Sequence, residues 1–279
     1  MASTITTRTP FQAATKIIEK AYTNRTRMVP PYYMSYMNVE SSDTRRSFAT
    51  FLPIVELGAL RYKPEGNAPT YDQPFESIPT SYLYSTYALA AQVTEEAQLE
   101  DPLNLMGKLP EMLADSETVT KDLFFNNVLN LGFYPSVVGP DMQPLFSTAH
   151  PLAPEATPTG IVSAVGQSFS NSLGATQLTP ESLQQAYILF ATLLSDRGLP
   201  SARTPRTLMV SPQMQKTAEE ILGTPLRPYT DENTKNVVAG SVELMVNRYL
   251  TSNTAWYVLG GKGALGSDSH AMTVLHHWE

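Results

Sequence analysis

The most constraining feature of the sequence is a long helical pattern over residues 104–131. Gly132 follows this stretch as a stop signal, and Pro110 lies so early that the helix either begins there or is kinked. At about 1.5 Å per residue such a helix would span about 42 Å. The apolar side chains at roughly helical spacing are Leu105, Leu109, Met112, Leu113, Val119, Leu123, Phe124 and Val128.

The N-terminal residues predict one short helix followed by an irregular apolar stretch. Apolar side chains spaced for one face predict the helix over residues 11–22. Residues 28–37 are apolar but aperiodic, and the pair Pro30-Pro31 forbids regular structure there. An apolar segment without its own fold normally lies along another surface. We therefore interpret residues 1–45 as an extended arm.

Residues 46–78 predict a long β-hairpin. Two β-rich stretches, 54–62 and 70–78, flank residues 64–69, where Pro, Gly and Asn supply turn chemistry. A two-stranded ribbon is marginally stable alone and usually needs a partner surface. An ordinary internal hairpin stays open as the alternative.

The C-terminal half mixes helices with strands. Thr179 caps a predicted helix that Gly198 closes, and Pro212 opens a second helix that ends at Gly223. Residues 134–174 have no periodicity. Strands are predicted over 207–210, 237–250, 255–259 and 272–278. Together with the long helix, this mixture places the chain in the α+β class.

Charged side chains are scarce in this chain. They make up 16% of 279 residues, against roughly 25% in an average soluble domain. Chance variation in composition, or an uncharged polar surface, would explain this low charge content. Burial between subunits would explain it equally well, because the cores of such contacts are poor in charge and rich in Tyr, Phe and Met. The net charge of −7 argues against a surface wholly devoted to nucleic acid. Residues 1–63 carry +5 and the remainder −12.

Several functional classes are excluded by composition. The chain has no cysteine, which rules out disulfides, thiol nucleophiles, zinc ribbons and iron–sulfur sites. No stretch approaches the roughly 18 apolar residues of a membrane span, and the N-terminus lacks the apolar core of a signal peptide. We expect a soluble chain that is not secreted.

The candidate catalytic residues are weak. Ser147 and His150 suggest a hydrolase, but no Gly-x-Ser-x-Gly elbow is present. We expect His150, which precedes Pro151, to be a packed or hydrogen-bonded loop side chain. The run 261–266 matches G-x-G-x-x-G. A dinucleotide-binding motif of this form opens a helix and is followed by an acidic residue about 20 positions on, and the sequence ends before that position, so we expect no such site.

Metal-binding and acidic candidates fail as well. On a strand, His276 and His277 point to opposite faces, while His270 and His276 lie about 20 Å apart. Adjacent acidic pairs, at 95–96, 100–101 and 219–220, have the look of solvated turns or helix faces. The sequence therefore predicts no catalytic, cofactor-binding or metal residues.

A resemblance does emerge from several short segments in order. The stretch from Asn126 through the motif Leu145-Phe-Ser-Thr-Ala-His-Pro151 resembles the segment after the long helix in major capsid proteins of tailed bacteriophages. The segments 178–183, 196–200, 207–222 and 249–259 are similar to that family in the same order. The resemblance covers about residues 95–260.

This resemblance implies the Hong Kong 97-type fold. Its parts would be an N-terminal arm (1–45), an E-loop hairpin (46–78), a peripheral domain (79–155 and 245–279) with the spine helix 104–131, and an axial domain (156–244). Similar proteins continue past the position of Trp278 with further strands, so the chain is expected to be a short variant or truncated. In this fold the arm and E-loop would cover neighbouring subunits.

The implied function is structural rather than enzymatic. The chain would be the major capsid protein that assembles as pentamers and hexamers into an icosahedral head, with portal, scaffold or maturation protease as partners. Double-stranded DNA would be held by non-specific contact, without cofactor or membrane, in a virion assembled in the host cytoplasm. Lys63 is expected to be an exposed hairpin lysine rather than a crosslinking residue. The alternatives are an encapsulin-type compartment and a Ser147/His150 hydrolase.

Overall fold

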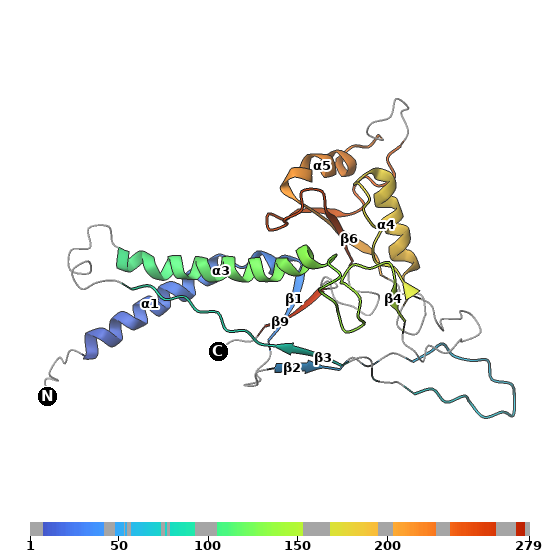
Figure 1. Ribbon diagram of the computed structural model, residues 1–279, viewed down its shortest axis with the longest axis horizontal. Helices are drawn as coiled ribbons and strands as arrows, with labels where there is room; N and C mark the ends of the chain where they lie inside the picture. The colour runs from blue at the N-terminus through green and yellow to red at the C-terminus, as the bar shows by residue number, and fades with distance from the viewer. Residues whose placement is uncertain are drawn as a thin grey trace. The chain divides into compact units, whose positions relative to one another are not determined.

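The structure of the chain is a computed structural model (Figure 1). It divides into two compact units, Met1–Ser35 with Ser85–Asn126, and Tyr36–Tyr84 with Asn127–Glu279. We describe each unit by itself. The described residues are 8–41, 48–52, 54, 57–73, 76, 79–92, 105–152, 168–194, 203–226, 235–260 and 272–276.

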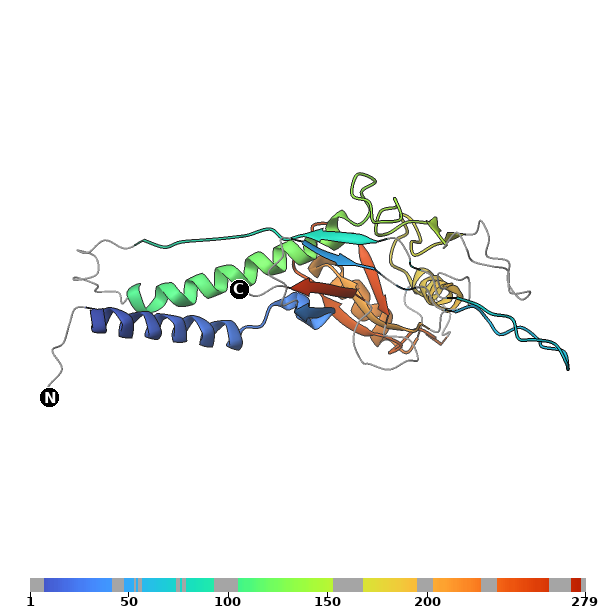
Figure 2. The ribbon, with the colours of Figure 1, turned by 90° about the horizontal axis from the view of Figure 1, so that it is seen from below.

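Two helices dominate the first unit. Helix α1 spans Arg8–Met28 and helix α3 spans Leu105–Leu131, with the last turn of α3 in the second unit. The two helices lie alongside each other in both views (Figures 1 and 2). The prediction of a helix over 104–131 is confirmed for its described residues, and the helix runs through Pro110. The prediction of a helix over 11–22 was too short, because helical structure continues to Met28.

The apolar stretch after α1 has a partner within its own chain. The 3₁₀ turn η1, Tyr32–Ser35, buries Tyr33 completely. The backbone N–H of Tyr33 donates to Asp122 Oδ1 at 3.0 Å, and its ring lies 4.3 Å from that of Phe125. Burial raises the pKa of Tyr33 to about 12. Within the arm predicted over residues 1–45, residues 8–28 are thus helical and residues 32–35 form an anchored 3₁₀ turn.

The predicted hairpin exists, but its regular strands lie elsewhere. Strand β2, Phe48–Phe51, pairs antiparallel with β3, Thr80–Leu83, at the base of the hairpin. An isolated antiparallel bridge joins Ile54 to Glu76. The two strand predictions, 54–62 and 70–78, are wrong for their described residues, which form no regular strand.

The tip of the hairpin is a tight turn. Asn67 N–H donates to the carbonyl of Pro64, and Gly66 between them has a φ of 81°. A type II turn requires a positive φ at its third residue, which glycine adopts without strain. The predicted turn over 64–69 is confirmed, and Lys63 lies exposed beside it.

The second unit is built around a three-stranded sheet. The order is β7 (Glu243–Val246), β6 (Pro205–Val210) and β8 (Trp256–Gly260), with β6 parallel to β7 and antiparallel to β8. The predicted boundary between residues 244 and 245 falls inside β7. The sheet therefore combines strands from both predicted segments.

Two helices cover this sheet and complete the core. Helix α4 spans Pro180–Thr192, and helix α5 spans Gln215–Gly223 after the 3₁₀ turn η2, Pro212–Met214. Strand β6 is the apolar centre, since its last four residues are all buried. The buried cluster consists of Leu178, Leu183, Leu208, Val210, Ala218, Ile221, Leu222 and Val238.

Helix α4 has the predicted N-terminal cap. The Thr179 hydroxyl accepts from the Ser182 N–H at 3.1 Å, and Ser182 Oγ accepts from the Thr179 N–H at 2.8 Å. Pro180 occupies the first turn, where its missing N–H costs nothing. The helix ends at Thr192 rather than near Gly198, because Leu193 has the extended dihedrals φ −57° and ψ 134°.

We expect Thr179→Ala to lower the free energy of unfolding by about 1 kcal/mol, because the Ser182 N–H loses its acceptor. Urea denaturation followed by circular dichroism measures this change. Thr192→Ala at the other end of α4 is the matched control, since its hydroxyl only bonds back to Ile188 and Leu189 carbonyls of its own helix. An equal loss in both variants would contradict the capping role.

The remaining strands are short. Strand β1, Met37–Ser41, pairs in parallel with β9, Met272–His276, and β4, His150–Pro151, pairs with β5, Ser168–Phe169. The strand predicted over 237–250 is wrong outside Glu243–Val246. Residues 237–240 are a turn in which Gly240, with a φ of 65°, donates its N–H to the Leu222 carbonyl. No helix in the described part of the chain is long and apolar enough to span a membrane.

Candidate assembly surfaces

The hairpin exposes large apolar side chains at its far end. Every residue from 60 to 73 is exposed, including Leu60 at 99%, Tyr62 at 91% and Tyr71 at 86%. The Gly58 N–H donates to Asp72 Oδ2 at 2.8 Å, which holds the two halves of the ribbon together. The hairpin is therefore a paired ribbon whose apolar side chains find no cover in the described chain.

Helix α3 carries a second exposed apolar surface. Met112, Val119 and Leu123 are exposed, and their spacing of seven and four residues places them on one face of the helix. We call these three residues the α3 stripe. Exposed apolar residues that share one face mark interaction sites more often than isolated ones do.

Polar contacts join α1 to α3 within the first unit. Arg25 Nε donates to Asp115 Oδ1 at 2.7 Å and Nη2 to Oδ2 at 2.9 Å, a bidentate pair. The Tyr22 hydroxyl donates to Glu117 Oε2, and Lys121 Nζ pairs with the other oxygen, Oε1. These contacts link the last turns of α1 to the middle of α3.

The Arg25–Asp115 pair should make α1 docking sensitive to acid. The hydrogen bond from Arg25 lowers the pKa of Asp115, so the pair stabilises the docked helix above the ordinary aspartate pKa. This stabilisation is lost as the pH falls through the lowered value and the carboxylate is protonated. We expect amide exchange in residues 16–28 to accelerate below about pH 4, after correction for the intrinsic rate. Asp115→Asn should show fast exchange already at neutral pH, and slow exchange in that variant would contradict the role.

The candidate hydrolase pair does not form. His150 Nδ1 lies 2.6 Å from Asp141 Oδ2, and its ring stacks on Phe169. Ser147 Oγ donates to Gln143 Oε1 and accepts from a backbone N–H. His150 Nε2 is buried without a hydrogen-bond partner in the described chain, so it does not activate Ser147. The expectation of a packed or hydrogen-bonded histidine is confirmed, but His150 lies on strand β4 rather than in a loop.

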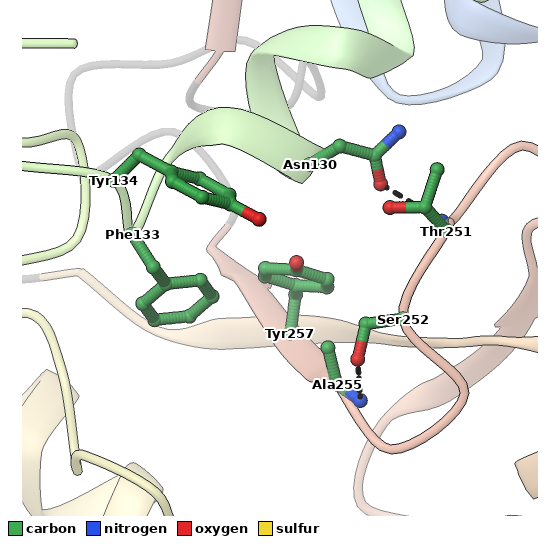
Figure 3. Close-up of a pocket in the computed structure, with 7 residues that line it drawn as sticks. All are labelled: Asn130, Phe133, Tyr134, Thr251, Ser252, Ala255 and Tyr257. Atoms are coloured by element: carbon green, nitrogen blue, oxygen red, sulfur yellow. Dashed lines mark hydrogen bonds between the residues drawn. The ribbon is translucent and has the colours of Figure 1, made fainter. Parts of the chain in front are cut away.

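One pocket of about 430 Å³ lies in the second unit, where α3 ends (Figure 3). Asn130 closes one side by donating to the Tyr249 carbonyl and accepting from the Thr251 N–H. The Tyr257 hydroxyl donates to the Leu129 carbonyl. The described residues that line the pocket include no carboxylate, histidine or lysine. The lining residues are Asn130, Phe133, Tyr134, Thr251, Ser252, Ala255 and Tyr257.

The other sequence candidates remain without a site. Residues 261–266, His270 and His277 lie outside the described residues, as do the acidic pairs at 95–96 and 100–101. Within the described segments, no three His, Asp or Glu side chains are grouped as a metal site would need. The surfaces on the hairpin and α3 are the strongest functional candidates.

The comparisons with known proteins agree with an assembly role. Residues 79–276 match a family described as phage capsid protein, and this match covers more than half of the chain. The chain belongs to the phage capsid protein family. The predicted resemblance to capsid proteins is thereby confirmed. A comparison with curated protein sequences found no match.

Solved capsid structures share the fold. The procapsid subunit of bacteriophage JBD30 matches with a TM-score of 0.62 and 15% identity, over 88% of this chain and 100% of that chain. The JBD30 capsid decorated with minor capsid protein trimers matches with a TM-score of 0.60 and 14% identity, over 80% and 92%. Another JBD30 capsid structure gives 0.62 and 14% over the same shares. At these identities the structures establish the fold alone.

Family and fold together confirm the predicted α+β capsid fold and the function as a major capsid protein of a tailed phage. The phage capsids found do not favour the encapsulin-type alternative. Sequence reasoning missed the α1–α3 contacts and the Asp141–His150 pair, because each joins residues with no periodic relation. It also missed the α3 stripe, although the three residues belong to the predicted helical pattern, because that pattern does not tell which side is covered.

Proposed function

We propose that this capsid protein builds an icosahedral head in which its hairpin and arm cover neighbouring copies. The observation that carries the proposal is the hairpin tip, where Leu60, Tyr62 and Tyr71 are almost fully exposed on a ribbon too thin to bury them. Burial against a second copy removes this apolar surface from water. The low charge of the chain fits extensive contacts between subunits.

The proposal keeps the predicted division into parts, although the boundary between residues 244 and 245 falls inside β7 and the three-stranded sheet crosses it. Residues 1–45 are the arm, 46–78 the E-loop, 79–155 and 245–279 the peripheral domain, and 156–244 the axial domain. Strand β3 lies just past the predicted end of the E-loop, at Thr80–Leu83, and pairs with β2 at the base of the hairpin. Axial domains pack around the symmetry axes of pentamers and hexamers, and the role is mechanical rather than catalytic.

The proposed partners are those that a DNA-enclosing head requires. The shell encloses double-stranded DNA through non-specific contacts, is joined by a portal, and matures with a scaffold or protease. Assembly takes place in the host cytoplasm, and the product is part of the virion. Lys63 forms no crosslink in this account, so on denaturing gels of mature particles this chain should run as a monomer without a covalent ladder.

Negative-stain electron microscopy of the purified full-length chain, with and without co-expressed scaffold, tests the proposal. We expect capsomers or closed shells. A monodisperse monomer under all of these conditions would contradict the proposal. Particles purified from infected cells should contain nuclease-protected DNA of genome length, whereas a protein cargo in its place would indicate an encapsulin-type compartment.

A further inference from the structure

Helix α1 presents a row of cations on one face. Lys16, Lys20 and Arg27 are all exposed, and at 3.6 residues per turn they fall within about 40° of one another around the helix. Along the axis they extend over about 16 Å. We call these three residues the α1 basic row. None of them forms an ion pair or hydrogen bond with a residue in the described part of the chain.

The basic row faces away from the contacts that hold α1 on α3. Tyr22 and Arg25, which reach Glu117 and Asp115, lie on the opposite side of α1 from the row. Those two acidic side chains are already engaged, Asp115 by Arg25 and Glu117 by Tyr22 together with Lys121. The row is therefore separate from the docking surface and has no acidic partner on the described part of α3.

The surroundings of the row favour a polyanion over a protein partner. Thr23 and Asn24, both exposed and polar, lie on this face, and the exposed Glu19 borders it beside Lys16. Protein interfaces have an apolar centre, and none of the side chains described on this face is apolar. Contacts to a nucleic acid backbone need only cations and polar groups, and they carry no sequence information.

We propose that the α1 basic row binds the phosphate backbone of the enclosed duplex DNA without sequence preference. The inference rests on the proposed function as a DNA-enclosing head and assigns the DNA contact to Lys16, Lys20 and Arg27. The charge distribution supports it: α1 carries five basic side chains and one acidic side chain, whereas the whole chain has a net charge of −7.

The test compares Lys16→Gln/Lys20→Gln/Arg27→Gln with wild type, using unassembled full-length subunits. Fluorescence anisotropy with a labelled duplex of arbitrary sequence, about 30 base pairs long, gives the affinity between about 50 and 200 mM KCl. Each phosphate contact contributes about −0.9 to the slope of log K against log salt, so the variant should lose about 2.7 of that slope. Between about 50 and 200 mM KCl, the fold-decrease in the affinity of the variant should therefore be about 40 times smaller than the fold-decrease for wild type.

The matched control is Arg61→Gln/Lys63→Gln/Arg203→Gln, which removes the same charge from exposed positions outside α1. This variant should keep the wild-type slope. The proposal is overturned if wild type binds no DNA, or if the two variants lose the same slope. It is also overturned if the row variant binds DNA normally but no longer forms shells, because the row would then contact an acidic neighbouring copy. Negative-stain microscopy scores shell formation by wild type separately. A wild type that forms no shells would contradict the proposed function, whereas the anisotropy measurement tests DNA binding by the α1 basic row.

Discussion

The triple variant Leu60→Ser/Tyr62→Ser/Tyr71→Ser should fold normally and form no shells. Each side chain is at least 86% exposed, so its replacement removes no contact that stabilises the described fold. Burial of a large apolar side chain contributes about 1.5–3 kcal/mol, so the three contribute about 5 kcal/mol or more at each contact between copies. That is more than three orders of magnitude in the association constant, at about 1.4 kcal/mol per factor of ten.

Negative-stain microscopy and sedimentation measure assembly of this variant, and thermal unfolding measures its fold. Arg61→Ser/Lys63→Ser/Glu65→Ser is the matched control, because these residues share the same exposed tip but are charged. We expect the control to assemble like wild type and both variants to keep the wild-type melting temperature. Normal shells from the apolar variant would show that the hairpin tip is not an interface.

Leu183→Ala should lower the free energy of unfolding by about 2–5 kcal/mol. Leu183 lies on α4, is completely buried, and belongs to the cluster that joins α4, β6 and α5. The substitution removes apolar contacts and leaves a cavity that the surrounding side chains fill only in part. A loss of this size is a large fraction of the total stability of a domain.

Ile188→Ala provides the comparison on the same helix. Ile188 is 56% exposed, so its truncation should cost less than about 1 kcal/mol. Urea denaturation of the unassembled subunits gives both values. Equal losses for the two substitutions would mean that α4 does not pack through the face that carries Leu183.

Elements with a local signal could be predicted from the sequence. The helix over 104–131, the turn at residues 64–69 and the cap at Thr179 are each set by residues close together in the chain. Strand β6 was predicted over 207–210, and the structure begins it two residues earlier, at Pro205. The family resemblance then supplied the order of the parts.

Elements that depend on distant partners could not be predicted. Strand β1 forms because Met37–Ser41 pairs with Met272–His276 at the other end of the chain. Tyr33 is anchored by Asp122, which lies 89 residues further along the chain. Nothing in the sequence distinguishes Asp122 from the other polar residues of its helix. The hairpin strands were predicted over 54–62 and 70–78, but the regular pairing is at its base, between β2 and β3. The reason is that β-propensity depends on packing that the exposed tip does not provide.

Of the candidate surfaces, only the one with a local sequence signal could be predicted. The hairpin was recognised as a ribbon in need of a partner, because its turn chemistry is local. The α3 stripe was not, because the sequence gives the apolar positions of the helix but not which of them the rest of the chain covers. Met112 and Ala114 are both apolar, yet the structure exposes the first and buries the second.

A cryo-electron microscopy reconstruction of the assembled particle tests the central claim most directly. The account predicts a closed icosahedral shell in which density for residues 57–73 of each copy lies against a neighbouring copy, with Leu60, Tyr62 and Tyr71 buried there. A shell in which this hairpin projects into solvent, or particles without icosahedral order, would contradict it.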